Sequence, residues 1–98
     1  MSNATNRMIA KVENAFQAYS AENVSHVSFS QIKDWLNNNT RDGISSNRLS
    51  YVLRRTPQFI KVDTFRRIGS NATETFWALE GSEGEIKTMK GWVKVENE

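Results

Sequence analysis

Apolar side chains recur every three or four positions over residues 5–19, and polar side chains occupy much of the opposite side. The apolar series consists of Met8, Ile9, Val12, Phe16 and Tyr19. Alanines, which are strong helix formers, lie between these positions. Because one turn of an α-helix takes 3.6 residues, the spacing predicts an amphipathic helix over 5–19 that buries one stripe.

A second helix is predicted to begin after Ser28. Ser28 and Gln31 match the capping-box pattern, in which each side chain bonds the other residue's backbone amide. The apolar positions that follow at helical spacing are Phe29, Ile32, Trp35 and Leu36. The Asn-rich run 37–39 should end the helix, and Gly43 marks the turn beyond it.

A third helix is predicted to be capped by Ser45 or Ser46 and to end near Arg55. Pro57 sets this end, because the residue before a proline is pushed out of helical conformation. The buried stripe of this helix should consist of Leu49, Val52 and Leu53. The three predicted helices would therefore share one core.

The remaining apolar runs are typical of strands. Residues 26–28 are long enough for one rung of a sheet, and residues 59–67 are rich in Phe, Ile, Val and Thr. The loop-forming run 69–72 leads into a return strand over 74–79, so a hairpin is expected. Residues 81–98 read as a link followed by a short apolar segment, a C-terminal extension of the domain.

This order of elements resembles the winged helix-turn-helix family over residues 5–80. The residues that carry the resemblance are Ser28, Phe29, Ile32, Trp35, Leu36, Ile44, Ser45, Ser46, Leu49, Leu53, the run 54–59 and the run 76–79. The resemblance implies an α+β winged helix-turn-helix domain, with a three-helix core and a two- to three-stranded antiparallel sheet that forms a wing. It also implies that the third helix enters the DNA major groove, while the wing lies on the backbone or minor groove.

Charge is unevenly distributed along the chain. Residues 41–67 carry seven basic and two acidic side chains, whereas the rest carries six basic and nine acidic ones. The net charge of +2 therefore conceals a basic stretch that holds six of the seven arginines. Arginine suits phosphates and guanine edges, so the stretch predicts a polyanion-binding surface if these side chains converge. If they do not converge, it is an ordinary solvated surface.

The third helix has a surface suited to reading bases. With Leu49 as the core direction and about 100° per residue, Asn47, Tyr51 and Arg54 point away from the core. The DNA-binding residues expected on this helix are Ser46, Asn47, Arg48, Ser50, Tyr51, Arg54 and Arg55. No carboxylate occurs over residues 45–58, which favours contact with nucleic acid over a mixed solvent face. If about five phosphates are neutralised, the logarithm of affinity should fall against the logarithm of salt with a slope near −4.5.

Other side chains are expected to support the contact with double-stranded DNA. The supporting set consists of Ser30, Lys33, Arg41, Arg66, Arg67 and Asn71. Serines at a helix start could hold a phosphate, although each is first of all a cap. Arginines that lead into the wing suit a narrow minor groove, or else they form a charged edge that discourages aggregation.

The composition argues against catalysis. The chain has no Cys and one His, it lacks a Gly-rich phosphate loop, and its carboxylates show no paired arrangement. We therefore expect no enzyme activity, no metal, no cofactor and no small-molecule ligand. No apolar run approaches the roughly 18 residues that cross a bilayer, and no signal-peptide pattern occurs. A cytoplasmic protein, associated with the nucleoid or chromatin and engaged in transcription regulation, is the expectation.

Two other functions stay open. A protein-interaction module in a larger assembly would use the first helix and the segment around Trp92, which could also form a homodimer. RNA or single-stranded nucleic acid is the other alternative, with Tyr51 stacked on a base. Trp92 could instead fold back on the first helix. His26, Trp35 and Trp77 are expected to be structural, with their ring nitrogens hydrogen-bonded.

Overall fold

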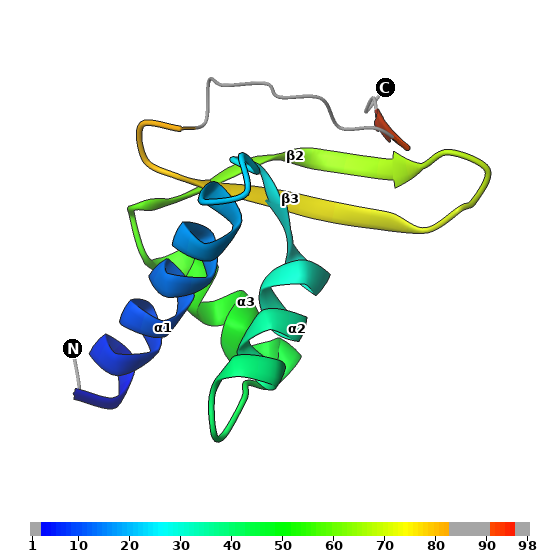
Figure 1. Ribbon diagram of the computed structural model, residues 1–98. Coiled ribbons are helices and arrows are strands. Elements are labelled where there is room, and N and C mark those ends of the chain that lie inside the picture. Colours follow the sequence, from blue (N-terminus) through cyan, green and yellow to red (C-terminus); the bar gives the residue numbers. More distant parts are fainter. Residues whose placement is uncertain (1–2, 83–90, 96–98) are drawn as a thin grey trace.

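Helices lie below an antiparallel sheet in the computed structural model, which describes residues 3–82 and 91–95 (Figure 1). In chain order the elements are α1 (Asn3–Ser20), β1 (Val27–Ser28), α2 (Phe29–Asn39), α3 (Ser46–Arg55), β2 (Phe59–Arg67), β3 (Thr73–Leu79) and β4 (Trp92–Lys94). The strands β2 and β3 form a hairpin that extends past the helices. We call this hairpin the wing. The predicted helices and the predicted hairpin are confirmed.

The start of α2 is held by the predicted capping box. The Ser28 hydroxyl oxygen accepts a hydrogen bond from the amide of Gln31 at 3.1 Å, and the Gln31 side-chain oxygen accepts one from the amide of Ser28 at 3.0 Å. At the other end, the amide of Thr40 donates to the carbonyl oxygen of Leu36 at 3.0 Å. Both ends of the helix therefore use groups that are close in sequence.

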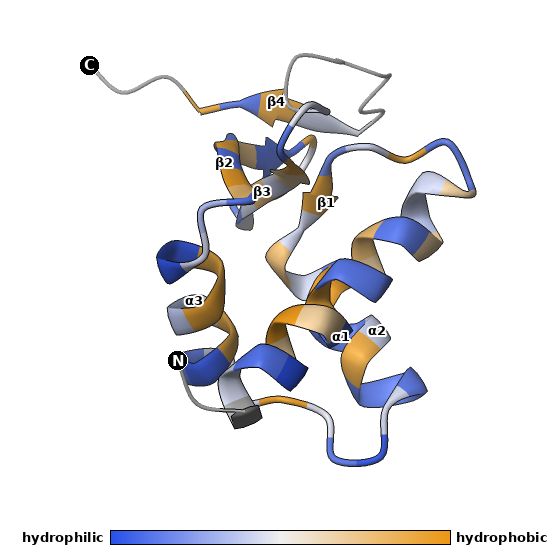
Figure 2. Cartoon of the chain, turned by 90° about the vertical axis from the view of Figure 1, so that its left-hand side faces the viewer, coloured by the Kyte–Doolittle hydropathy of each residue, from blue (hydrophilic) through white to orange (hydrophobic). Residues whose placement is uncertain are grey.

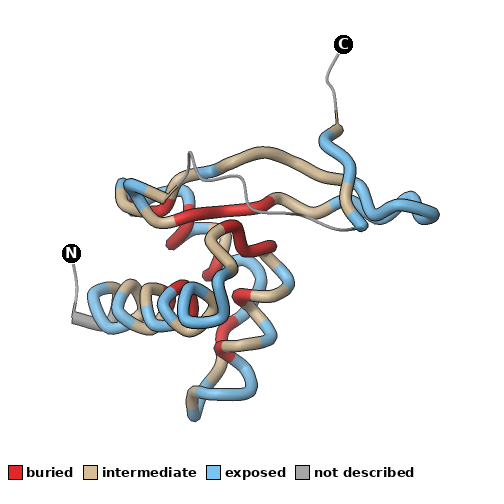
Figure 3. The backbone as a smooth tube through the Cα atoms, turned by 45° about the horizontal axis from the view of Figure 1, so that its top comes forward, coloured by how far each residue is buried: buried red, intermediate tan, exposed pale blue. Residues whose placement is uncertain are grey.

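The core forms where the helices face one another and the sheet. In Figure 2, α3 turns its hydrophilic side outward, and Figure 3 shows the buried stretches on the inner sides of the elements. The fully buried large side chains are Val12, Val27, Ile32, Leu36, Leu49, Val52 and Leu53. Phe16 of α1 stacks on Phe59 of β2, with ring centres 5.5 Å apart. The predicted apolar stripes thus meet in one core.

The sheet has one strand more than the two or three expected. Its order is β1-β3-β2-β4, and each described pairing is antiparallel. The additional strand, β4, lies in the segment assigned to the C-terminal extension. A three-residue strand has too little periodicity to be recognised, and its pairing with β2 joins residues far apart in sequence. Trp92 packs edge-on against Phe76 at 5.1 Å, and so it lies on the sheet.

Two buried rings lack the hydrogen bonds expected of them. His26 and Trp77 are 5% and 7% exposed, and no described group bonds either nitrogen of His26 or the indole nitrogen of Trp77. The ladder between β1 and β3 places Trp77 opposite Val27 in an apolar core, where side-chain acceptors are scarce. Trp77 is therefore a core anchor, as predicted, but its expected hydrogen bond is absent from the described residues.

Candidate nucleic-acid interface

The exposed side of α3 carries the residues predicted to read bases. Ser45 caps the helix, because its hydroxyl oxygen accepts a hydrogen bond from the amide of Arg48 at 3.3 Å. Leu49 and Leu53 are fully buried, whereas the side chain of Tyr51 is 51% exposed. We define the α3 outer face as Ser46, Asn47, Arg48, Ser50, Tyr51, Arg54 and Arg55, of which Ser50 is half-buried and the rest exposed. The direction assigned to the core from helical spacing is therefore confirmed.

Two arginines of the α3 outer face are held by neighbours on the same helix. The Arg54 Nε–H donates to the carbonyl oxygen of Ser50 at 3.3 Å. The Arg55 guanidinium lies 5.3 Å from the centre of the Tyr51 ring, in a cation–π contact. Arg54 keeps the donors of both terminal nitrogens for an external acceptor. Holding the side chains in advance reduces the conformational entropy lost on binding.

A groove of about 350 Å³ separates α3 from the wing. Its lining residues are Phe29, Ser50, Arg54, Lys61, Thr73, Glu74, Thr75 and Trp77. Arg54 contributes positive charge from α3, and Lys61 contributes it from β2. The groove thus joins basic groups from two elements that are adjacent in space.

An irregularity in β2 places two basic residues on the same face of the wing. Lys61 pairs with Trp77, and Arg66 pairs with Thr73, so both lie on the face of the wing that lines the groove. Arg66 lies five positions after Lys61, and side chains of a regular strand at that spacing would point to opposite faces. The register shift between Lys61 and Asp63 restores one common face. We call it the groove face of the wing.

The opposite face of the wing, which we call the far face, holds an aromatic cluster and a balanced pair of charges. The aromatic side chains are Phe65, Phe76 and Trp92. The Arg67 guanidinium lies 5.9 Å from the centre of the Trp92 ring. Lys94 and Asp63 form an ion pair at 3.0 Å. The hydrogen bond from the amide of Thr64, and then Lys94, lower the pKa of Asp63, so this carboxylate stays ionised. Lys94 balances its negative charge on the face of the wing away from the groove.

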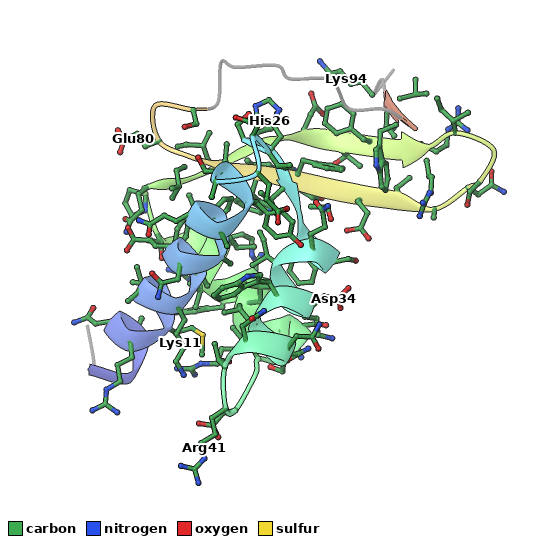
Figure 4. The ribbon with its side chains drawn as sticks, in the orientation of Figure 1. Lys11, His26, Asp34, Arg41, Glu80 and Lys94 are labelled. Atoms are coloured by element: carbon green, nitrogen blue, oxygen red, sulfur yellow. The ribbon has the colours of Figure 1, made fainter. Side chains whose placement is uncertain are left out.

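The supporting residues predicted from sequence do not form one group. Adjacent residues of a strand point to opposite faces, so Arg66 lies on the groove face and Arg67 on the far face. A terminal nitrogen of Arg66 donates to the carbonyl oxygen of Ser70 at 3.3 Å, and Asn71 is exposed in the same loop. Arg41 projects from the turn between α2 and α3, at the end of the molecule remote from the sheet (Figure 4).

At the start of α2, the groups expected to hold a phosphate already have a partner. The amide and the hydroxyl of Ser30 both donate to the carboxylate of Glu74, at 3.0 and 2.5 Å. Lys33, one turn further along, is half-buried. Ser30 therefore lies next to Glu74, which lines the groove, and its donors already have an acceptor.

Sequence reasoning did not assign Lys61 and Glu74 to the site. The position of Lys61 depends on the irregularity in β2. The spacing of apolar residues does not predict such an irregularity. The position of Glu74 depends on the pairing of β1 with β3, across more than forty residues of chain. The signal in the sequence that pointed to Lys61 was its place in the basic stretch. Regular strand alternation would put it on the face opposite to that of Arg66.

Comparison with known proteins shows a shared fold. No protein-family model and no curated protein matches this chain. The structure is similar to the crystal structure of a "putative nucleic acid binding protein" from an uncultured marine organism, with a TM-score of 0.58 and 17% sequence identity. The likeness covers 82% of this chain and 87% of that chain. Within residues 3–82 and 91–95, no helix is both long and apolar enough to span a membrane.

Proposed function

We propose that this protein binds double-stranded DNA as a winged helix-turn-helix domain and acts in transcription regulation or chromatin association. The α3 outer face enters the major groove, and the groove face of the wing lies along the backbone or minor groove. The proposal is of a binding protein and not of an enzyme. The similar fold of the marine protein, whose description names nucleic acid binding, is in keeping with it.

The observation that carries the proposal is a basic surface shared by α3 and β2. Arg54 and Lys61 line one groove, and Arg66 continues their charge along the groove face of the wing. The α3 outer face carries no carboxylate. Basic side chains on two neighbouring elements can contact successive phosphates of one backbone, and each neutralised phosphate releases counterions.

In the proposed complex, some side chains contact phosphates and position the protein, and others contact bases and read the DNA sequence. Arg48, Arg54, Arg55, Lys61 and Arg66 supply five exposed cations that can neutralise phosphates. Asn47 and the free edge of Arg54 suit adenine and guanine, each good pairing discriminating by about 1–3 kcal/mol. The helix therefore supplies specificity together with three of the five cations, and the wing supplies orientation and the other two cations.

The test is a salt titration of duplex binding with matched variants. The wild type should show a slope of about −4.5 for five phosphates. The double variant R54A/R55A should bind roughly tenfold or more weakly, with a slope that is less steep by about 1.8. The control R7A/K11A removes the same charge from α1, none of whose described residues lines the groove, and it should bind nearly as the wild type does. Fluorescence anisotropy at several salt concentrations measures each case.

Two outcomes would contradict the proposal. Equal losses in R54A/R55A and R7A/K11A would mean that net charge alone sets the affinity. Absence of duplex binding at low salt would favour a role in protein contact. A single strand of the same length, bound more tightly than the duplex and dependent on Tyr51, would favour the single-strand alternative.

A further inference from the structure

A carboxylate from the wing sits on the first turn of α2. Oε1 of Glu74 accepts a hydrogen bond from the amide of Ser30 at 3.0 Å, and Oε2 accepts one from its hydroxyl at 2.5 Å. Ser30 is the second residue of α2, so its amide is one of those left unpaired by the helix itself. The positive end of the helix dipole adds a further attraction for a carboxylate.

Strand register explains how Glu74 reaches this position. Val27 of β1 pairs with Trp77, and Ser28 pairs with Phe76. If the pairing continued for two residues, Ser30 would lie opposite Glu74. The chain has by then turned into α2, so the side chain of Glu74 replaces the backbone partner that a longer strand would supply. The contact is thus built by the fold and does not depend on chance packing at the surface.

The same carboxylate lines the groove beside the basic side chains. Of the described residues that line it, Glu74 is the acidic one, and it shares the groove with Arg54 and Lys61. In helix-turn-helix docking the first helix of the motif crosses the phosphate backbone. Glu74 therefore occupies donors that a phosphate would use, and its charge repels a phosphate that approaches them.

We propose that Glu74 keeps the nucleic-acid backbone off the first turn of α2. The inference rests on the proposed function and adds to it. By removing one sequence-independent phosphate contact, Glu74 lowers the affinity for any duplex, whatever its sequence, and leaves the base contacts of α3 unchanged. Because that contact would contribute equally to specific and non-specific complexes, Glu74 limits the overall affinity and its salt dependence, while the preference for one sequence over another stays with α3.

The test compares two variants that remove the same charge from different places. E74Q neutralises the carboxylate and keeps an oxygen that Ser30 can bond. The control E80Q removes an exposed charge at the end of β3 remote from the tip of the wing (Figure 4). E74Q should bind a non-specific duplex roughly threefold to tenfold more tightly than E80Q does. Its salt slope should be steeper by up to about 0.9, since one more phosphate is neutralised.

Amide chemical shifts with the same duplex locate the change. In E74Q the amides of Ser30 and Gln31 should shift on titration, and in the wild type they should stay in place while α3 amides shift. Equal affinity of E74Q and E80Q, or weaker binding by E74Q, would overturn the inference. So would Ser30 shifts of equal size in both proteins. Wild-type α3 amides that do not respond to duplex would instead overturn the proposed function, and the inference with it.

A second variant separates loss of charge from loss of the contact. S30A removes the hydroxyl donor but leaves the carboxylate of Glu74 charged. It should bind duplex no more tightly than the wild type does. Tighter binding by S30A, equal to that of E74Q, would show that loosening of the wing causes the gain, and it would overturn the proposal.

Discussion

Gly43 turns the chain between α2 and α3 with a φ of 59°, in the left-handed region that side chains other than glycine seldom adopt. A Cβ atom at this position would lie 2.2 Å from the side-chain oxygen of Asn37. That oxygen accepts a hydrogen bond from the amide of Ile44 at 3.0 Å, one residue before the cap of α3. The turn therefore combines a backbone requirement with a close contact.

The Gly43→Ala variant should lower the free energy of unfolding by about 2–3 kcal/mol, since it adds backbone strain and displaces Asn37. Gly69→Ala is the matched control: its φ is 82°, but no atom lies within 4 Å of the added Cβ. This control should lose only about 1–2 kcal/mol from backbone strain. Urea denaturation measures both, and equal losses would mean that the contact with Asn37 has no energetic weight.

At the scale of the helix, one of two adjacent serines determines where α3 begins. The sequence allows either Ser45 or Ser46 as the cap, because both can accept from a first-turn amide. In the structure Ser45 accepts from the amide of Arg48, and Ser46 is the exposed first residue of the helix. This one-residue choice decides whether Ser46 belongs to the helix, whereas the rest of the α3 outer face follows from the direction of Leu49 and Leu53.

Alanine substitutions at the two serines should therefore differ. Ser45→Ala removes the cap and should lower the free energy of unfolding by about 1 kcal/mol. Ser46→Ala changes an exposed side chain and should stay within about 0.5 kcal/mol of the wild type. Thermal unfolding followed by circular dichroism distinguishes the two, and a larger loss at Ser46 would place the start of α3 one residue later.

At the scale of the whole molecule, the two faces of the wing have different roles: the groove face belongs to the proposed interface, and the far face stabilises the sheet. The groove face carries Lys61, which lines the groove with Arg54, and Arg66, which lies nearer the tip of the wing. The far face uses Arg67 to cover Trp92 and pairs Lys94 with Asp63, which attaches β4 to β2. Side chains adjacent in sequence thus contribute either to the proposed interface or to the stability of the sheet.

The two arginines of the wing should accordingly respond in opposite ways. Arg66→Ala should weaken duplex binding roughly fivefold and reduce the salt slope by about 0.9. Arg67→Ala should leave duplex affinity nearly unchanged and lower the free energy of unfolding by about 0.5–1 kcal/mol through the lost contact with Trp92. Anisotropy and denaturation on the same samples check the pair. Equal losses of affinity would mean that the wing contacts DNA with both faces.

The amino-acid sequence by itself determined the helices, the hairpin and the exposed side of α3. These features depend on residues within one or two turns of each other, such as Ser28 with Gln31 or Leu49 with Leu53, so spacing and capping suffice to predict them. The basic stretch likewise predicted a polyanion-binding surface, but it did not indicate which of its charges face the same way.

Only the tertiary structure decided how the groove is composed. The register shift in β2 brings Lys61 and Arg66 to one face, and the pairing of β1 with β3 brings Glu74 to Ser30. Strand pairing joins residues far apart in the chain, and a shift of one residue exchanges the two faces of a strand. Local sequence patterns do not specify the register of strand pairing. The positions of Arg67, Glu74 and β4 are therefore known only from the tertiary structure.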